Sequence, residues 1–282
     1  MTYAESNVIT DRPIVSLAGL TLPALPPALL VSAAAQAGYD AVGVNLTQLW
    51  RTVSGDPRWF AAEVDSLADA LSQHGLRLTH GGHLLMGALD RHGVGHIMNA
   101  MRQLDAEHLV LVAAPQRDSS QIEADFVFVC EQMDDIPVLV EFAPYTGWKS
   151  LDDAMAFIER HPTVELGLVV DVLHLVRSGS LDRWLARDAW PVGLVQICDA
   201  PLRSPQPDAL QMEARGNRLD VGEGSLPLAE IFRALPRHVP IEVEAPCLAL
   251  RNLTPVARAE RSLRHLEIFL RSQGYRTRVV PS

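Results

Sequence analysis

The chain has 282 residues, of which 48% are hydrophobic and 21% are charged, so it is long enough to enclose one large core. Acidic residues outnumber basic ones by 34 to 24, and the resulting net charge of -10 argues against general binding to nucleic-acid phosphates. Three widely spaced cysteines, Cys130, Cys198 and Cys247, argue against a disulfide framework or a structural zinc knuckle.

The chain starts with MTYAESNVITDRP, which lacks the basic and apolar regions of a secretory signal. Its apolar runs are all shorter than a membrane-spanning helix requires. We therefore expect a cytoplasmic protein whose partner is a small molecule, with no role for nucleic acid or membrane. The loop after residue 141 carries Trp148, which is compatible with a subunit contact in a homo-oligomer.

Short apolar runs alternate with longer amphipathic ones from one end of the chain to the other. The helix over 56–75 has the clearest signals, because Asp56 is a good N-cap, Pro57 suits the first turn and Gly75 suits the end. The longest irregular connection, over 200–225, is of a length that is usually functional or disordered. The sequence predicts strands over 13–20, 41–46, 76–83, 108–114, 137–142, 166–171, 193–199 and 240–246, and helices over 26–40, 56–75, 93–107, 120–135, 150–161, 226–235 and 254–274.

Repeated strand–helix units of this number indicate a single (β/α)8 TIM barrel of the α/β class, with residues 1–282 forming one domain. The predicted strands are apolar on both faces, as in a parallel sheet that is covered by helices. A doubly wound open sheet is the alternative. Its dinucleotide-binding form is disfavoured because no GxGxxG motif follows the first strand.

Polar side chains stand at the carboxyl ends of four consecutive predicted strands, where TIM barrels carry their catalytic residues. These residues are Glu141, Asp171, Gln196 and Glu244. Side-chain alternation places them on one face, and carboxylates gathered in a partly dry site repel one another unless a cation binds. One such residue alone would suit a helix cap or an arginine partner. The four together predict a divalent metal site, with Mg²⁺ or Mn²⁺ favoured by the oxygen donors and Co²⁺ or Zn²⁺ as alternatives.

The stretch GLVVDVLHLVRSG, over 167–179, places a histidine three residues after Asp171. His174 would lie in the first turn beyond the strand, where it could contact a substrate oxygen or relay a proton. A surface loop is the other interpretation of this histidine. Glu242 would lie one layer deeper than Glu244, where an unpaired charge is costly, and Arg77 or Arg12 is a candidate partner.

Five segments between Val138 and Pro246 resemble the xylose isomerase-like TIM-barrel superfamily, which includes sugar phosphate isomerases and epimerases. They are VLVEFAP, LVVDVLHLVRSG, LVQICDAP, NRLDVGEGSLPL and PIEVEAP. The resemblance matches Glu141, Asp171 and Glu244 to metal ligands, and His174 to the histidine of an Asp-x-x-His element. It also matches Arg218 to an arginine that contacts substrate.

Gln196 departs from many members of this superfamily, which have histidine at the corresponding position. The 3-dehydroshikimate dehydratases resemble this chain in having glutamine there. An amide oxygen can ligate a hard cation, but glutamine cannot exchange protons.

These residues predict a divalent-metal-dependent isomerase or epimerase that acts on a ketose-like polyhydroxy carbonyl substrate through an enediolate. Glu141, Glu244 and His174 are the predicted catalytic residues, and Arg218 is a predicted substrate contact. His80 and His83, in LTHGGHLLMG, are further candidates for substrate binding because the glycines allow close backbone approach, although a core or loop position would explain them equally well. The alternatives are a metal-dependent lyase of the 3-dehydroshikimate dehydratase type and a non-catalytic sugar-binding protein.

Overall fold

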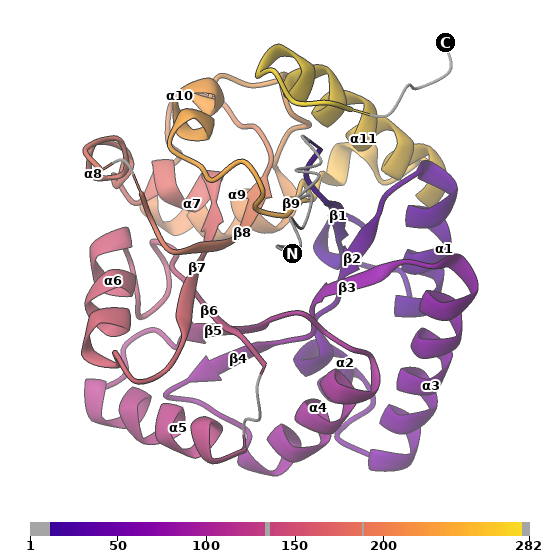
Figure 1. Ribbon diagram of the computed structural model, residues 1–282, viewed down its shortest axis with the longest axis vertical. Helices are drawn as coiled ribbons and strands as arrows, with labels where there is room; N and C mark the ends of the chain where they lie inside the picture. The colour runs from indigo at the N-terminus through magenta and orange to yellow at the C-terminus, as the bar shows by residue number, and fades with distance from the viewer. Residues whose placement is uncertain (1–11, 133–135, 188, 278–282) are drawn as a thin grey trace, which may run out of the picture.

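The computed structural model describes residues 12–132, 136–187 and 189–277, and its strands form a ring that is surrounded by helices (Figure 1). Neighbouring strands run parallel in the order β3-β2-β1-β9-β8-β7-β6-β5-β4. Their bounds are β1 Val15–Ala18, β2 Ala41–Gly43, β3 Arg77–His80, β4 His83–Met86, β5 Leu109–Ala113, β6 Val138–Glu141, β7 Leu166–Asp171, β8 Val192–Ile197 and β9 Ile241–Val243.

The ring closes through one segment, because β3 and β4 are consecutive parts of the chain that the pair Gly81–Gly82 interrupts. This segment bonds to β2 on one side and to β5 on the other. The backbone N–H of Val44 donates to His80 O at 3.1 Å, and that of Val110 donates to Gly82 O at 2.9 Å. The predicted TIM barrel is therefore confirmed. The third predicted strand, over 76–83, is two short strands because the glycines break its regular pairing.

Helices cover the outside of the ring (Figure 1). The cap predicted for α3 is present, since the Asp56 side chain accepts the Arg58 N–H and Gly75 adopts a left-handed φ of 65°. The bounds are α1 Pro27–Ala37, α2 Leu46–Thr52, α3 Pro57–His74, α4 Arg91–Gln103, α5 Ser119–Gln132, α6 Leu151–Arg160, α7 Val172–Arg177, α8 Leu181–Leu185, α9 Leu210–Gly216, α10 Leu228–Arg233 and α11 Pro255–Ser272, with 3-10 turns at Gly19–Thr21, Pro207–Ala209 and Leu248–Leu250.

Some of the sequence predictions fall on undescribed parts of the chain. Residues 1–11, where the sequence indicates no secretory signal, are among them, as are residues 133–135 at the end of the helix predicted over 120–135. Within the described ranges, no helix combines the length and the apolar character that crossing a membrane would require.

The inside of the barrel has its own small apolar cluster, separate from the main core between strands and helices. It is formed by Val110, Leu139, Val169 and Leu194, with Val112 packed against it. Because side chains alternate along a strand, the residues two positions after Leu139, Val169 and Leu194 also face inward. Those residues are Glu141, Asp171 and Gln196, so the fold places the predicted polar set above an apolar floor on this side of the barrel.

Candidate metal centre

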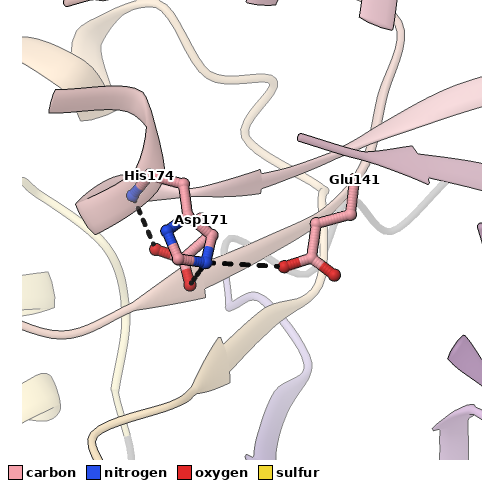
Figure 2. A group of neighbouring side chains, drawn as sticks. All are labelled: Glu141, Asp171 and His174. Carbon is pink, nitrogen blue, oxygen red and sulfur yellow. Dashed lines mark hydrogen bonds and ion pairs between the residues drawn. The ribbon is translucent and has the colours of Figure 1, made fainter. Parts of the chain in front are cut away.

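Three side chains with metal-ligating atoms meet where β6 and β7 end (Figure 2). Glu141 is the last residue of β6, Asp171 is the last residue of β7, and His174 lies in the first turn of α7. One ligand atom from each lies within 4.8 Å of the others, and all three side chains are buried. His174 Nε2 is 3.7 Å from Asp171 Oδ2 and 3.8 Å from Glu141 Oε1. Two carboxylates and an imidazole in this arrangement form a candidate site for a divalent cation.

Asp171 is also the N-cap of α7, which explains the spacing between the aspartate and the histidine. Its Oδ1 accepts the backbone N–H groups of Leu173 at 2.8 Å and His174 at 3.1 Å. These bonds satisfy two of the unpaired donors at the start of the helix and fix the turn that carries the imidazole. The short helix α7 lies outside the helices predicted from the sequence, because its six residues are too few to show a helical period.

The long connection over 200–225 is folded against the barrel and delivers Arg218 to the site. The Asp199 carboxylate accepts the backbone N–H groups of Gly222 at 3.1 Å and Leu226 at 3.0 Å. A buried ion pair joins Arg177 Nη2 to Glu213 Oε1 at 2.8 Å. These contacts hold the connection before and after Arg218, so Arg218 occupies a fixed position between them.

The guanidinium of Arg218 bridges two of the predicted metal ligands. Nη1 lies 2.6 Å from Asp171 Oδ2, and Nη2 lies 3.0 Å from Glu244 Oε2. Nε donates to Ala214 O at 2.7 Å. The Arg218 side chain is 1% exposed, so its charge acts on these carboxylates with little screening by water.

Gln196 lies beside Glu244 and completes the set of four predicted ligands. Its Nε2 donates to Glu242 Oε2 at 3.0 Å and to Glu244 Oε1 at 3.2 Å. Its Oε1 is buried and has no hydrogen-bond partner among the described residues. An unsatisfied buried carbonyl oxygen is costly, which fits a position where a ligand supplies the missing partner.

Glu242 is fully buried one layer below, and the partner suggested from the sequence is wrong. Arg12 pairs with Asp40, and Arg77 pairs with Glu107. The partners of Glu242 are instead hydroxyl, imidazole and amide groups inside the barrel, namely Ser16, Thr79, His80 and Gln196. The missed signal is a hydroxyl residue inside each strand, Ser16 in VSLA and Thr79 in RLTH, because side-chain alternation turns both positions toward the inside of the barrel.

The two candidate substrate-binding histidines occupy different levels. His80 Nε2 is 3.0 Å from Glu242 Oε2, and its side chain is buried with the deeper layer. His83 Nε2 lies 3.4 Å from Glu141 Oε2, and one fifth of its side chain is exposed. In the loop after β6, the Tyr145 hydroxyl lies 3.3 Å from His174 Nε2, while Trp148 is buried against Phe157.

Burial and neighbouring charges lower the pKa of three groups in the site and raise the pKa of a fourth, Glu244. Burial raises the pKa of Glu141, but the neighbouring His83 and His174 outweigh it and leave that pKa below its ordinary value. Arg218 similarly outweighs burial at Asp171 and lowers its pKa. Burial lowers the pKa of His174. Burial, with the repulsion of Asp171 and Glu141, raises the pKa of Glu244 to about 8 in spite of Arg218.

This electrostatic balance would suit a bound cation. Burial and mutual repulsion drive one carboxyl, Glu244, toward its protonated form, because Arg218 alone does not neutralise its neighbours. The close cluster of Glu141, Asp171 and His174, together with the buried Gln196 Oε1 that lacks a partner among the described residues, also favours a bound cation. The residues present therefore fit a divalent ion.

A family model described as xylose isomerase-like TIM barrel matches residues 31–269, which is most of the chain. The chain belongs to this family. The match covers the strands and helices that carry the candidate metal centre, so the likeness noted in the sequence is confirmed. No curated protein matches the chain as a sequence relative.

Solved structures of similar fold cover nearly the whole chain. A crystal structure of IolI protein with a bound zinc atom has a TM-score of 0.71 at 17% identity, covering 94% of this chain and 99% of that one. D-allulose 3-epimerase from Methylomonas sp. has a TM-score of 0.62 at 17% identity, covering 93% and 98%. The 3-keto-D-glucoside 4-epimerase YcjR from E. coli has a TM-score of 0.62 at 14% identity, covering 91% and 100%. At these identities the likeness establishes the fold.

Proposed function

We propose that this protein is a divalent-metal-dependent sugar isomerase or epimerase that acts on a polyhydroxy carbonyl substrate. The observation that carries the proposal is the meeting of Glu141, Asp171 and His174 within 4.8 Å of one another at the mouth of the barrel. Active sites of TIM barrels lie at this end of the strands. Epimerases among the structures of similar fold, and a zinc-bound one, support the same conclusion.

Glu141, Asp171, Gln196 and Glu244 would hold the ion, with His174 beside them. The oxygen donors favour Mg²⁺ or Mn²⁺, while the nearby imidazole leaves Co²⁺ or Zn²⁺ open. A bound divalent ion would supply Lewis-acid polarisation of a carbonyl group, which acidifies the adjacent C–H.

The chain's own residues would carry the proton. Glu141 is the last residue of β6 and Glu244 directly follows β9, with β7 and β8 between these strands, so the two carboxylates approach a substrate in the barrel mouth from different sides. One carboxylate removes the proton from carbon, which leaves an enediolate, and the other returns a proton to carbon. In an epimerase the proton returns to the opposite face of the same carbon, and in an isomerase it returns to the neighbouring carbon.

Two histidines, His174 and His83, would bind the substrate. His174 would contact a substrate oxygen, and the Tyr145 hydroxyl lies 3.3 Å from the same imidazole. His83 lies beside Glu141 with part of its side chain exposed, whereas His80 is buried against Glu242. We therefore assign the substrate contact to His83 in preference to His80. Arg218, which the sequence resemblance matches to a substrate contact, is buried against Asp171 and Glu244, so we assign it to holding these carboxylates in place.

The test is to load the purified protein with Mn²⁺ and incubate it with ketohexoses in D₂O. Incorporation of solvent deuterium at a carbon next to the carbonyl, together with a new epimer or isomer, is the expected result. A Glu141→Gln variant should lose this exchange. Full exchange in that variant, or none in the wild type with any polyhydroxy carbonyl compound, would count against the proposal.

A second candidate is a metal-dependent lyase, and Gln196 is the observation that favours it, because 3-dehydroshikimate dehydratases resemble this chain at that position. Such an enzyme begins with the same proton removal but expels hydroxide from the β-carbon as water. Incubation with 3-dehydroshikimate separates the two, since only the lyase yields an aromatic product. Sugar binding that Glu141→Ala leaves intact, without turnover, would instead indicate a non-catalytic sugar-binding protein.

A further inference from the structure

We propose that Glu242 is a positioning residue that orients the amide of Gln196, so that the Gln196 carbonyl oxygen faces the bound cation. This inference rests on the proposed metal-binding function. Glu242 would not bind the cation itself; it contacts Gln196, one of the proposed ligands.

The amide of Gln196 has one orientation that its neighbours allow. A carboxylate accepts hydrogen bonds and donates none, so the group facing Glu242 Oε2 at 3.0 Å must be the Gln196 NH₂. The carbonyl oxygen then points away from Glu242. It is buried and lacks any partner within the described part of the chain, so it is available to a ligand in the mouth of the barrel.

Glu242 is itself held by three contacts besides the one to Gln196. Its Oε1 accepts a hydrogen bond from Ser16 Oγ at 2.9 Å, and Thr79 Oγ1 lies 3.1 Å from the same oxygen. His80 Nε2 lies 3.0 Å from Oε2. Gly43 leaves the necessary space, since a Cβ there would overlap both Glu242 Oε1 and His80 Nε2. Both carboxylate oxygens are thus engaged and the side chain is fully buried.

Glutamine needs such a neighbour more than a carboxylate ligand would. The two ends of an amide have nearly the same shape, but rotation of the terminal group by a half turn would present N–H groups to a cation. Glu244 Oε1 accepts from the same NH₂ at 3.2 Å, but Glu244 is itself a proposed ligand, whereas Glu242 holds the amide from below the ion. Partners beyond the ligands commonly fix ligand orientation in metal sites, and their loss costs affinity.

The test is a double-mutant comparison of Mn²⁺ affinity, measured by calorimetry on the full chain. Glu242→Gln should weaken binding by roughly 10- to 100-fold when Gln196 is present, because the new amide can either donate or accept. In a Gln196→Ala background the same substitution should change affinity by less than about 3-fold, because no amide remains to be oriented. Asp125→Asn is the control, since Asp125 is also buried but bonds to Gly87 and Leu89; it should leave affinity unchanged.

An equal loss in both backgrounds would show that Glu242 acts only through its charge and would overturn the proposal, as would no loss in either. A wild-type protein that binds no divalent ion would instead refute the proposed function. If the Glu242→Gln variant does not fold, a second measurement on the wild type tests the same proposal. In the metal-free wild type, the side-chain N–H signals of Gln196 should exchange slowly with solvent. Fast exchange would overturn the orientation by Glu242 independently of any metal.

Discussion

Arg218 joins Asp171 to Glu244, with Nη1 2.6 Å from the first carboxylate and Nη2 3.0 Å from the second. All three groups are buried, and two of them are proposed to hold the cation. The guanidinium therefore supplies part of the positive charge that balances these carboxylates. A cation and Arg218 would act on the same negative charges, so the loss of one should be compensated in part by the other.

Replacing Arg218 by methionine tests this relationship. The Arg218→Met variant should lose roughly 3–5 kcal/mol of stability in EDTA, because two buried carboxylates are left without their partner. Added Mn²⁺ should recover part of that loss and stabilise the variant more than the wild type. Urea unfolding in EDTA and in Mn²⁺ measures both effects.

Arg177→Met is the matched control, because Arg177 forms a comparably buried pair with Glu213, which is not one of the proposed metal ligands. It should also be destabilised, but Mn²⁺ should stabilise it no more than the wild type. Equal recovery in both variants would mean that the ion acts elsewhere on the chain.

Asp171→Asn separates the two functions of Asp171. Asparagine is as good an N-cap as aspartate, so α7 should persist and His174 should keep its place. The neutral amide replaces a charged ligand, however, and Mn²⁺ affinity should fall by at least about 100-fold. Calorimetric titration measures the affinity. Asp56→Asn, which changes the cap of the distant helix α3, should leave it unaltered. An unchanged affinity in Asp171→Asn would exclude this carboxylate as a ligand.

The barrel and the polar ends of its strands could be predicted because both depend on local pattern. Eight apolar runs separated by helical segments define the fold, and alternation alone places Glu141, Asp171 and Gln196 on the inner face, where the structure has them. The break at Gly81–Gly82 is harder to predict, since it depends on how the same segment pairs with β2 and with β5. Its glycines were a visible sign that the strand would not be regular.

The partners of the buried charges could not be predicted from the sequence, because they come from residues far apart in the chain. Arg218 lies 47 residues from Asp171, and Ser16 lies 226 residues from Glu242. Sequence patterns predict that a side chain faces inward but not which of several inward side chains it meets. The choice of Arg77 or Arg12 as the partner of Glu242 failed for this reason: Arg77 begins β3 and Arg12 precedes β1, and they pair with Glu107 and Asp40 instead.

Acid should reveal the buried charge of Glu242. Burial raises its pKa, but His80, Gln196 and Ser16 outweigh burial and lower it from 4.5 to about 2. A carboxyl whose pKa is lowered by folding stabilises the fold at pH values above its pKa in the unfolded chain. That contribution is lost as the pH falls from about 4.5 to 2. The difference corresponds to roughly 3 kcal/mol. Urea unfolding across this range in EDTA should show a steep loss of stability for the wild type and a shallower one for Glu242→Gln.

Glu244 affects stability in a different pH range, so it does not obscure the comparison of wild type with Glu242→Gln in acid. Its pKa is raised to about 8, which makes the fold less stable as the pH rises from 4.5 to 8. By these two groups, the metal-free wild type should be most stable near pH 4.5, where the two ranges meet. If the free energy of unfolding fell equally between pH 4.5 and 2 in wild type and Glu242→Gln, the proposed ionisation of Glu242 would be contradicted.

Gly43 should be intolerant of even one added methyl group. A Cβ at this position on β2 would overlap Glu242 Oε1 and His80 Nε2, so Gly43→Ala must displace the buried pair. Overpacking of this kind costs about 1–3 kcal/mol, and a weakened ion pair adds to it. Chemical unfolding should show a loss at the upper end of that range, together with weaker Mn²⁺ binding because Gln196 loses its fixed neighbour.

Gly95→Ala provides the matched comparison within the same chain. Gly95 lies inside α4, and a Cβ there would meet no atom within 4 Å. Alanine is the better helix former, so this variant should gain roughly 0.5–1 kcal/mol and bind Mn²⁺ as the wild type does. If Gly43→Ala were as stable as Gly95→Ala, the space around Glu242 and His80 would be larger than the structure shows, and the rigidity inferred for Glu242 would be wrong.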